Sequence, residues 1–149
     1  TDVPDQLIAR IAADSKYWLW INDQLVIFEG GLKRGPSPSG TYYDPVDIAP
    51  YLTKGSNTIA ILLWHFGKDG FSHINSGKAA LLFEAIAPGL EIVSDASWQC
   101  ALYEAYQNTE APFPNYRMPE SNIRFDARQA ITNWNRTSSK VPSGGGLRR

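Results

Sequence analysis

The sequence contains few of the residues that build disulfides, metal sites and reactive thiols. Among its 149 residues are one cysteine, Cys100, and two histidines, His65 and His73. One cysteine cannot form an internal disulfide, and its spacing from the histidines matches no Cys/His zinc motif. We therefore interpret Cys100 as a small buried side chain. Cysteine usage leaves the compartment undetermined.

Net charge and long hydrophobic runs are also scarce. Fourteen basic and fifteen acidic residues leave a formal charge of -1, and no basic stripe alternates with aromatic residues, so a nucleic-acid partner is not expected. The longest apolar run, residues 58–66, is far shorter than the roughly 20 residues that span a bilayer, so no membrane partner is expected either. The chain opens on Thr1 without a signal-peptide pattern, which suggests a piece of a longer protein.

Aromatic and turn-forming residues are plentiful, and their pattern predicts β-structure. Five Trp and seven Tyr accompany twelve Gly and ten Pro. Apolar segments bounded by turn residues predict strands at residues 7–13, 17–21, 25–28, 58–66, 79–87, 90–93 and 97–103. Residues 122–128 are a further strand, or residues 127–135 a short helix. The pattern predicts an all-β fold, an antiparallel β-sandwich or jelly roll, with residues 58–66 as a central strand.

Two predicted strands are apolar on both faces. Side chains alternate across a strand, so Trp18 and Trp20 lie opposite Tyr17, Leu19 and Ile21. One face of the later strand carries Ala60, Leu62, Trp64 and Phe66. A two-sheet sandwich buries only one face of each strand, so the other face needs a cover. That cover is either a later segment with Phe113, Tyr116 and Trp134, or another domain that packs on Trp18, Trp20 and Trp64.

Asp44 and Asp47 form the acidic pair that most resembles a catalytic one. Glycoside hydrolysis normally uses two carboxylates about 5 to 9.5 Å apart. Here both precede a short connection in which Asp47 caps a helical turn with Pro50 near its start, and Asp is favoured at such positions. No nucleophile-elbow, zinc-protease or phosphate-loop motif is present. We therefore interpret both as structural and expect no catalytic residue in this chain.

Two polar loops, residues 29–40 and 67–77, carry the groups that a sugar site needs. A sugar presents apolar C–H faces and hydroxyls, which aromatic rings and polar side chains recognise. The carbohydrate-binding candidates are Arg34, Tyr43, Asp69, Phe71, His73 and Asn75. Residues 69–76 also offer oxygen ligands for a structural Ca²⁺, although they include one carboxylate. The alternative is that these loops pack on a neighbouring domain. His65 is interpreted as a core or interface histidine.

Seven short motifs follow one another in a particular order. They are residues 17–23 (YWLWIND), 35–36 (GP), 42–44 (YYD), 47–52 (DIAPYL), 55–60 (GSNTIA), 94–98 (SDASW) and 125–128 (FDAR). This order resembles the amino-terminal accessory domain of bacterial α-L-rhamnosidases over roughly residues 7–135, and a looser form is shared by galactose-binding-like modules. One departure is Asp23, where the family usually has Gly; the turn accepts Asp because Asp enters the left-handed region.

The resemblance implies a galactose-binding-like jelly-roll domain over residues 1–135, with core strands within residues 7–103. Residues 136–149 are then a flexible tail or linker to a catalytic domain that is not in this chain. The parent would be a periplasmic or secreted α-L-rhamnosidase. The chain itself is expected to be non-catalytic, to support the rest of its own enzyme as partner, and to bind rhamnose- or galactose-containing glycans weakly, without a cofactor. The alternative is an autonomous carbohydrate-binding module.

Overall fold

The computed structural model describes residues 2–32, 40–69, 74–109 and 123–136. The strands found there are β1 (Ile8–Asp14), β2 (Lys16–Ile21), β3 (Gln24–Gly31), β4 (Asp44–Asp47), β5 (Ile59–Trp64), β6 (Ala80–Ala87), β7 (Leu90–Val93), β8 (Tyr106–Asn108) and β9 (Ile123–Phe125). Two single turns of 3-10 helix are η1 (Ala49–Tyr51) and η3 (Ala127–Gln129).

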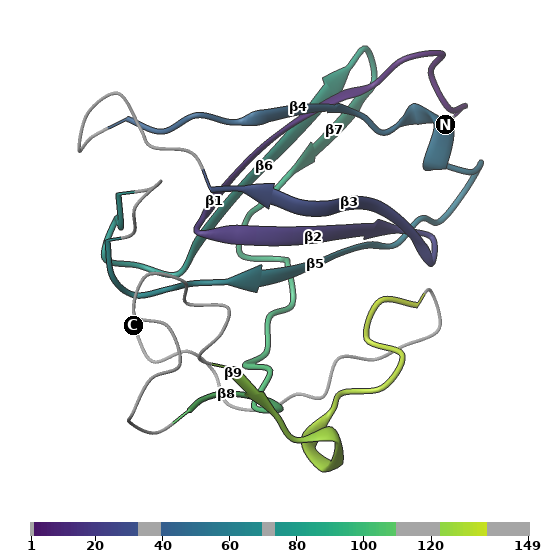
Figure 1. Cartoon of the computed structure of the whole chain (residues 1–149). Coiled ribbons are helices and arrows are strands. Elements are labelled where there is room, and N and C mark those ends of the chain that lie inside the picture. The colour runs from purple at the N-terminus through teal and green to yellow at the C-terminus, as the bar shows by residue number, and fades with distance from the viewer. Residues whose placement is uncertain (1, 33–39, 70–73, 110–122, 137–149) are drawn as a thin grey trace.

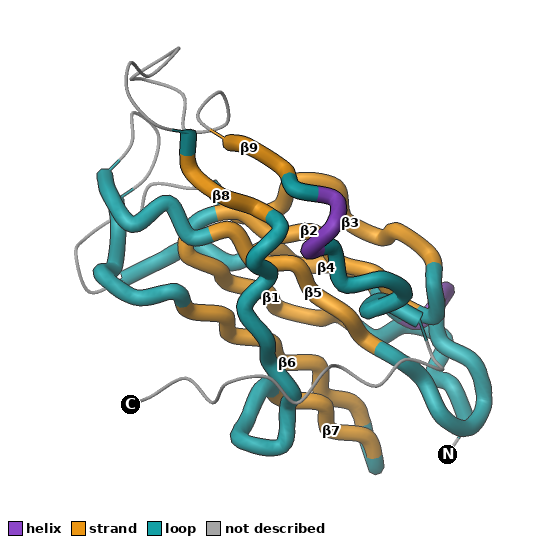
Figure 2. The backbone as a smooth tube through the Cα atoms, turned by 90° about the horizontal axis from the view of Figure 1, so that it is seen from below, coloured by secondary structure: helices purple, strands orange, loops and turns teal. Residues whose placement is uncertain are grey.

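The strands form two main antiparallel sheets that pack face to face (Figure 1). One has the order β4-β1-β6-β7 and the other the order β3-β2-β5. Strands β8 and β9 pair with each other and lie on the side of the β3-β2-β5 sheet that faces away from the first sheet (Figure 2). The predicted all-β antiparallel sandwich is confirmed, while the jelly-roll and galactose-binding-like assignments stay predictions.

Strand alternation fills the space between the sheets. In β2, the side chains of Tyr17, Leu19 and Ile21 are fully buried, whereas Trp18 and Trp20 on the other face are partly exposed. Residues from β1 and β6 belong to the same core cluster, namely Ala9, Ile11, Phe83 and Ala85. Full burial of a large apolar side chain contributes about 1.5–3 kcal/mol, so this interdigitation is the main source of stability. The predicted faces of β2 are confirmed.

The turn between β2 and β3 is the predicted hairpin turn. Its φ angles are +48° at Asn22 and +70° at Asp23, as a type I′ turn requires. The Asn22 side chain also accepts the Thr58 N–H (3.0 Å) and donates to Asn57 Oδ1 (2.7 Å). Asn57 Oδ1 in turn accepts the Thr53 N–H at 2.7 Å. These bonds hold the entry to β5 against the hairpin turn, so both asparagines of the sequence motifs have a structural role.

The long apolar strand β5 is an edge strand rather than the central strand that we predicted. Among the described residues it pairs only with β2, and the central positions belong to β1 and β6 in one sheet and to β2 in the other. An edge strand needs apolar side chains on both faces only if something packs on its outer face. Here the aromatic rings of the outer face pack on one another, which accounts for the uninterrupted apolar run.

Residues 97–103 do not form the predicted strand. Asp95 Oδ1 accepts both the N–H and the hydroxyl of Ser97, at 2.8 and 2.6 Å, which makes a turn. The Trp98 indole N–H donates to the Val93 carbonyl at 2.9 Å, and its ring lies 5.5 Å from that of Phe83. The chain thus leaves the sheet after β7. As a consequence Cys100 is exposed, and its interpretation as a buried residue was wrong.

The two readings of the segment after residue 122 are both correct in part. A short strand, β9, is followed by the single turn η3. Asp126 accepts the Arg128 N–H at 3.1 Å and pairs with the Arg128 guanidinium at 2.7 Å. The hydrogen bonds from Arg128 lower the pKa of Asp126 below its ordinary value. The FDAR motif is therefore a helix-capping device. The predicted tail lies outside the described residues beyond Arg136.

Candidate functional site

The outer face of the β3-β2-β5 sheet carries a row of aromatic side chains. Trp18 of β2 lies between Phe28 of β3 and Trp64 of β5, with ring centroids 6.3 and 6.4 Å away. Phe66 continues the row 4.9 Å beyond Trp64. We call Trp18, Phe28, Trp64 and Phe66 the aromatic row. It contains two of the three tryptophans predicted to pack against another domain.

The third of those tryptophans, Trp20, is covered by the chain's own C-terminal segment. Its ring lies 5.0 Å from that of Trp134, which is 6.3 Å from the ring of Tyr103. The prediction that Trp134 covers this face is therefore confirmed. Phe113 and Tyr116, the other predicted covering residues, lie outside the described residues.

The aromatic row itself is only partly covered. The Phe28 side chain is 71% exposed, which is unusual for an aromatic residue on a sheet face. At the Lys16 end of β2, the ammonium lies 5.8 Å from the Trp64 ring centroid and 3.4 Å from the Glu29 carboxylate. The row therefore combines an exposed apolar end with a buried, paired cation. Packing of Trp18, Trp20 and Trp64 against another domain stays a prediction.

Asp44 and Asp47, the tempting catalytic pair, both bond to the chain itself. Asp44 Oδ2 accepts the Tyr17 hydroxyl at 3.0 Å and the Gly31 N–H at 2.8 Å. Asp47 Oδ1 accepts the N–H groups of Leu7 and Ala49, at 3.0 and 3.1 Å. Burial, with the adjacent Asp44 carboxylate, raises the pKa of Tyr17. Both carboxylates therefore have structural contacts, as predicted, but not in the predicted positions. Asp44 lies in β4 rather than in a turn, and the N-cap of η1 is Ile48 rather than Asp47.

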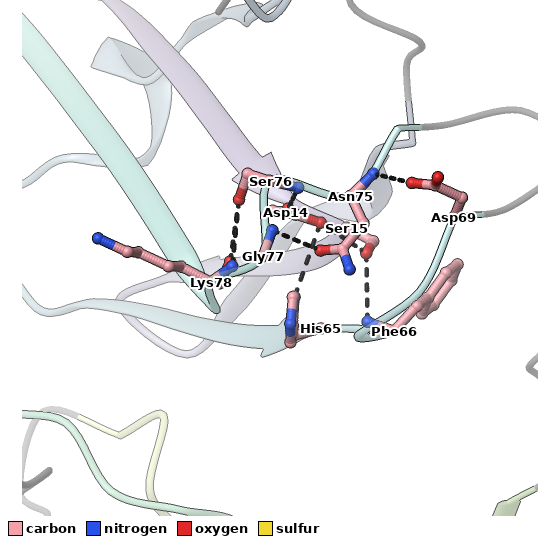
Figure 3. Close-up of polar contacts among 9 residues, drawn as sticks. All are labelled: Asp14, Ser15, His65, Phe66, Asp69, Asn75, Ser76, Gly77 and Lys78. Atoms are coloured by element: carbon pink, nitrogen blue, oxygen red, sulfur yellow. Dashed lines mark hydrogen bonds and ion pairs between the residues drawn. The ribbon is translucent and has the colours of Figure 1, made fainter. Parts of the chain in front are cut away.

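The sugar-binding candidates fall in separate places. Asp69 Oδ1 accepts the Asn75 N–H, and Asn75 Oδ1 accepts the Gly77 N–H, each at 2.8 Å (Figure 3). Arg34, Phe71 and His73 lie outside the described residues. Tyr43 lines a groove on the β4-β1-β6-β7 sheet that neither Asp69 nor Asn75 lines. The structure thus brings Asp69 and Asn75 together but does not place them with Tyr43.

A polar cluster that the sequence analysis missed lies where β1 passes into β2 (Figure 3). Asp14 accepts the Ser15 hydroxyl at 2.9 Å and the Ser76 N–H, and His65 Nδ1 is 3.7 Å from its carboxylate. Burial alone would raise the pKa of Asp14, but the hydrogen bonds from Ser76 and Ser15 and the charge of His65 lower it. The cluster fastens the loop before β6 to the corner between the two sheets, and no local sequence signal could have revealed it.

The groove around Tyr43 has a volume of about 420 Å³ and lies on the opposite side of the sandwich from the aromatic row. Its floor is Ala12, which points outward from β1 yet is only 8% exposed. Its walls are Tyr43 and Leu82, which are 52% and 64% exposed. Two residues along the same strands, Arg10 and Glu84 form a 2.7 Å ion pair. Of these residues only Tyr43 is a candidate from the sequence pattern, because the others come together only through strand register.

Nothing in the described part of the chain gathers three or more His, Cys, Asp or Glu side chains in a way that could hold a metal ion. In the loop predicted to offer Ca²⁺ ligands, the side-chain oxygens of Asp69 and Asn75 each accept a backbone N–H, and residues 70–73 lie outside the described residues. No helix in the described ranges has the length and apolar character needed to span a membrane.

Comparison with known proteins finds this fold in a solved structure. No protein-family model matches the sequence, and no curated protein matches it. Among solved structures, the chain is similar to the crystal structure of a GH78 family rhamnosidase of Bacillus sp. GL1, with a TM-score of 0.70 and 24% sequence identity. The similarity covers 93% of this chain and 14% of that one. The chain therefore has the fold of one segment of a GH78 family rhamnosidase.

Proposed function

We propose that this chain is an accessory β-sandwich domain of an α-L-rhamnosidase-like glycoside hydrolase. In this proposal it lies amino-terminal to the catalytic domain, which it supports, and does not hydrolyse glycosides itself. The shared fold with a segment that makes up 14% of a GH78 family rhamnosidase supports a parent enzyme of this kind. The order of the sequence motifs supports the amino-terminal position.

The state of the carboxylates supports a non-catalytic role. A glycosidase needs a carboxylic acid whose raised pKa keeps it protonated, near a second carboxylate. Hydrogen bonds to Asp14, Asp95 and Asp126 lower the pKa of each carboxyl group, which is opposite to what a general acid needs. Asp44 accepts hydrogen bonds from a tyrosine hydroxyl and a backbone N–H, and Asp47 accepts hydrogen bonds from two backbone N–H groups. The contacts of the acidic pair that most resembles a catalytic one are therefore those of structural carboxylates.

The aromatic row, which is exposed at its Phe28 end and only partly covered elsewhere, is the observation that carries the proposal. The chain's own C-terminal segment covers Trp20, but Phe28 at the far end remains 71% exposed. Aromatic side chains gathered on a partly exposed face are typical of interfaces. We propose that the catalytic domain of the same polypeptide packs on this row. It would cover the aromatic rings that Trp134, which packs on Trp20, leaves partly exposed.

The catalytic half of the proposal is tested by assaying the purified chain with an aryl α-L-rhamnoside. We expect no release of the aryl group above the buffer rate, because Asp44 and Asp47, the acidic pair that most resembles a catalytic one, both bond to the chain itself. Hydrolysis that is retained through purification and lost in an Asp44→Asn variant would contradict the proposal.

The supporting role is tested by Phe28→Ala in two contexts. In the isolated chain, we expect unfolding free energy to change by less than about 1 kcal/mol, because the side chain is mostly exposed. In the longer protein, burial of the ring by the partner domain makes the same change cost about 1.5–3 kcal/mol. Ile86→Ala, on the exposed face of the other sheet, is the matched control. Equal costs of Phe28→Ala in both contexts would contradict the docking role.

The groove that holds Tyr43 favours a second function, carbohydrate binding. It is compatible with the supporting role because the groove and the aromatic row lie on opposite sides of the sandwich. A domain that binds carbohydrate without docking to an enzyme would be an autonomous module, and the Phe28→Ala comparison distinguishes that alternative.

A further inference from the structure

The groove on the β4-β1-β6-β7 sheet is built by strand register. Ala12 pairs with Leu82 and Arg10 with Glu84 across β1 and β6. Because side chains alternate along a strand, these four share the outer face. On the other side of β1, Ile11 pairs with Asp44, so the preceding residue, Tyr43, comes opposite Ala12. A small residue flanked by two large ones leaves a hollow between them.

The groove offers two kinds of contact side by side. The Tyr43 ring and the Leu82 side chain provide apolar walls that are more than half exposed. Arg10 donates one hydrogen bond to Glu84 at 2.7 Å, and both side chains are about half exposed. A guanidinium has five N–H donors and a carboxylate two acceptor oxygens, so this single bond leaves both able to bond a ligand. The hydroxyl-bearing residues Thr41 and Ser94 also line the groove.

We infer that this groove binds one sugar ring of a carbohydrate chain. A sugar ring has an apolar C–H face that packs on an aromatic ring and hydroxyls that both donate and accept hydrogen bonds. Tyr43 and Leu82 take the apolar face, and Arg10 and Glu84 bond neighbouring hydroxyls. The ion pair balances charge within the groove, which favours a neutral polar ligand over an anion or a cation. Its volume of about 420 Å³ lies within the range of small-molecule sites, roughly 300–1,000 Å³.

The inference rests on the proposed function in its choice of carbohydrate as the ligand class. It adds a location, a set of contacts and a ligand that the domain binds by itself. It also differs from the sugar candidates Asp69 and Asn75, whose side chains bond the backbone of their own loop.

The test is a titration of the isolated, isotope-labelled chain with methyl α-L-rhamnopyranoside and, separately, methyl β-D-galactopyranoside, followed by amide NMR shifts. We expect at least one sugar to cause saturable shifts centred on Ala12, Tyr43 and Leu82. A dissociation constant near 1 mM corresponds to about 4 kcal/mol and suits a shallow site of this size. No saturable shift up to roughly ten times that concentration, or shifts centred on Asp69 and Asn75, would overturn the inference.

Variants distinguish this groove from incidental contacts. Tyr43→Ala and Arg10→Ala each weaken binding by about tenfold or more, since each removes a wall or a charged donor. Ala12→Leu fills the floor and abolishes binding; should it fail to fold, the exposed Tyr43→Ala variant carries the test alone. Phe28→Ala on the opposite face is the matched control and leaves binding unchanged. Unaltered affinity in Tyr43→Ala would overturn the inference, while the docking role would still be judged by Phe28→Ala in the longer protein.

Discussion

The hydrogen bonds from Tyr17 and Gly31 to Asp44 allow a sharp prediction about stability. One oxygen, Asp44 Oδ2, accepts both the Tyr17 hydroxyl at 3.0 Å and the Gly31 N–H at 2.8 Å. Tyr17 has no exposed surface and lies in the core cluster. Asp44→Ala removes the acceptor, and the buried hydroxyl then has no replacement from water.

The expected cost follows from the number of donors left unpaired. Each buried donor without a partner costs about 1–3 kcal/mol, so the loss of the acceptor for two donors in Asp44→Ala should lower the unfolding free energy by about 2–6 kcal/mol. That is a large part of the roughly 5–15 kcal/mol that stabilises a typical domain. A loss of about 3 kcal/mol corresponds to a fall in Tm of roughly 6–12 °C for a chain of this size.

Urea unfolding of four proteins measures the effect: the wild type, Asp44→Ala, Tyr17→Phe and the double variant. Tyr17→Phe keeps the ring and removes only the hydroxyl, so it should cost about 0.5–1.5 kcal/mol. In the Tyr17→Phe background, Asp44→Ala should cost about 1–2 kcal/mol less, because one unpaired donor is gone. Equal costs of Asp44→Ala in both backgrounds would refute the reasoning.

The hydrogen bond from Tyr17 to Asp44 also predicts how the stability of the chain changes with pH in the alkaline range. Burial and the Asp44 carboxylate raise the pKa of Tyr17 above its ordinary value of 10.0. The stabilising contribution is therefore complete below pH 10 and is lost as the pH rises above it, because the unfolded chain then releases a proton that the folded chain retains. The stability difference between wild type and Tyr17→Phe should fall above pH 10 by up to about 1.4 kcal/mol per pH unit. A difference that does not change between pH 8 and pH 11 would contradict the assignment.

Three further predictions concern the joints between strands. Gly30→Ala should destabilise the chain by more than about 2 kcal/mol, since the new methyl group would lie 2.7 Å from the Tyr17 hydroxyl oxygen and closer still to its ring; a Tm within about 2 °C of wild type would contradict this. Asn57→Ala should cost about 2–3 kcal/mol in urea unfolding, because its side chain makes several short bonds across the entry to β5; a cost below about 0.5 kcal/mol would count against it. Because the pKa of Asp14 is lowered, its contribution exists above its ordinary value of 3.8 and disappears as the pH falls below that; unfolding curves of wild type and Asp14→Asn should therefore converge in acid, and a gap that widens would argue otherwise.

The sequence by itself determined the features that depend on a residue and its near neighbours. Alternation in residues 17–21 set the two faces of β2, and Asn22-Asp23 determined the hairpin turn, whose left-handed φ angles these residue types accept. Asp44 and Asp47 were predicted to be structural because Asp is favoured at turns and caps, but both lie in β4, and their donors come from other strands and from the start of η1.

Only the tertiary structure decided which strands are central and where side chains from different strands meet. A strand's apolar content is the same whether it lies in the middle of a sheet or at an edge under aromatic rings, so β5 was misplaced from sequence. Residues 97–103 have a strand-like pattern but pair with no described strand, because Ser97 and Trp98 turn the chain away. The groove between Tyr43 and Leu82 arises because β-sheet register places Ala12 between them. Strand register brings together residues that are far apart in the chain. Tyr43 was predicted from sequence as a sugar-binding residue, but only the folded sheet places Arg10 and Glu84 in the same groove.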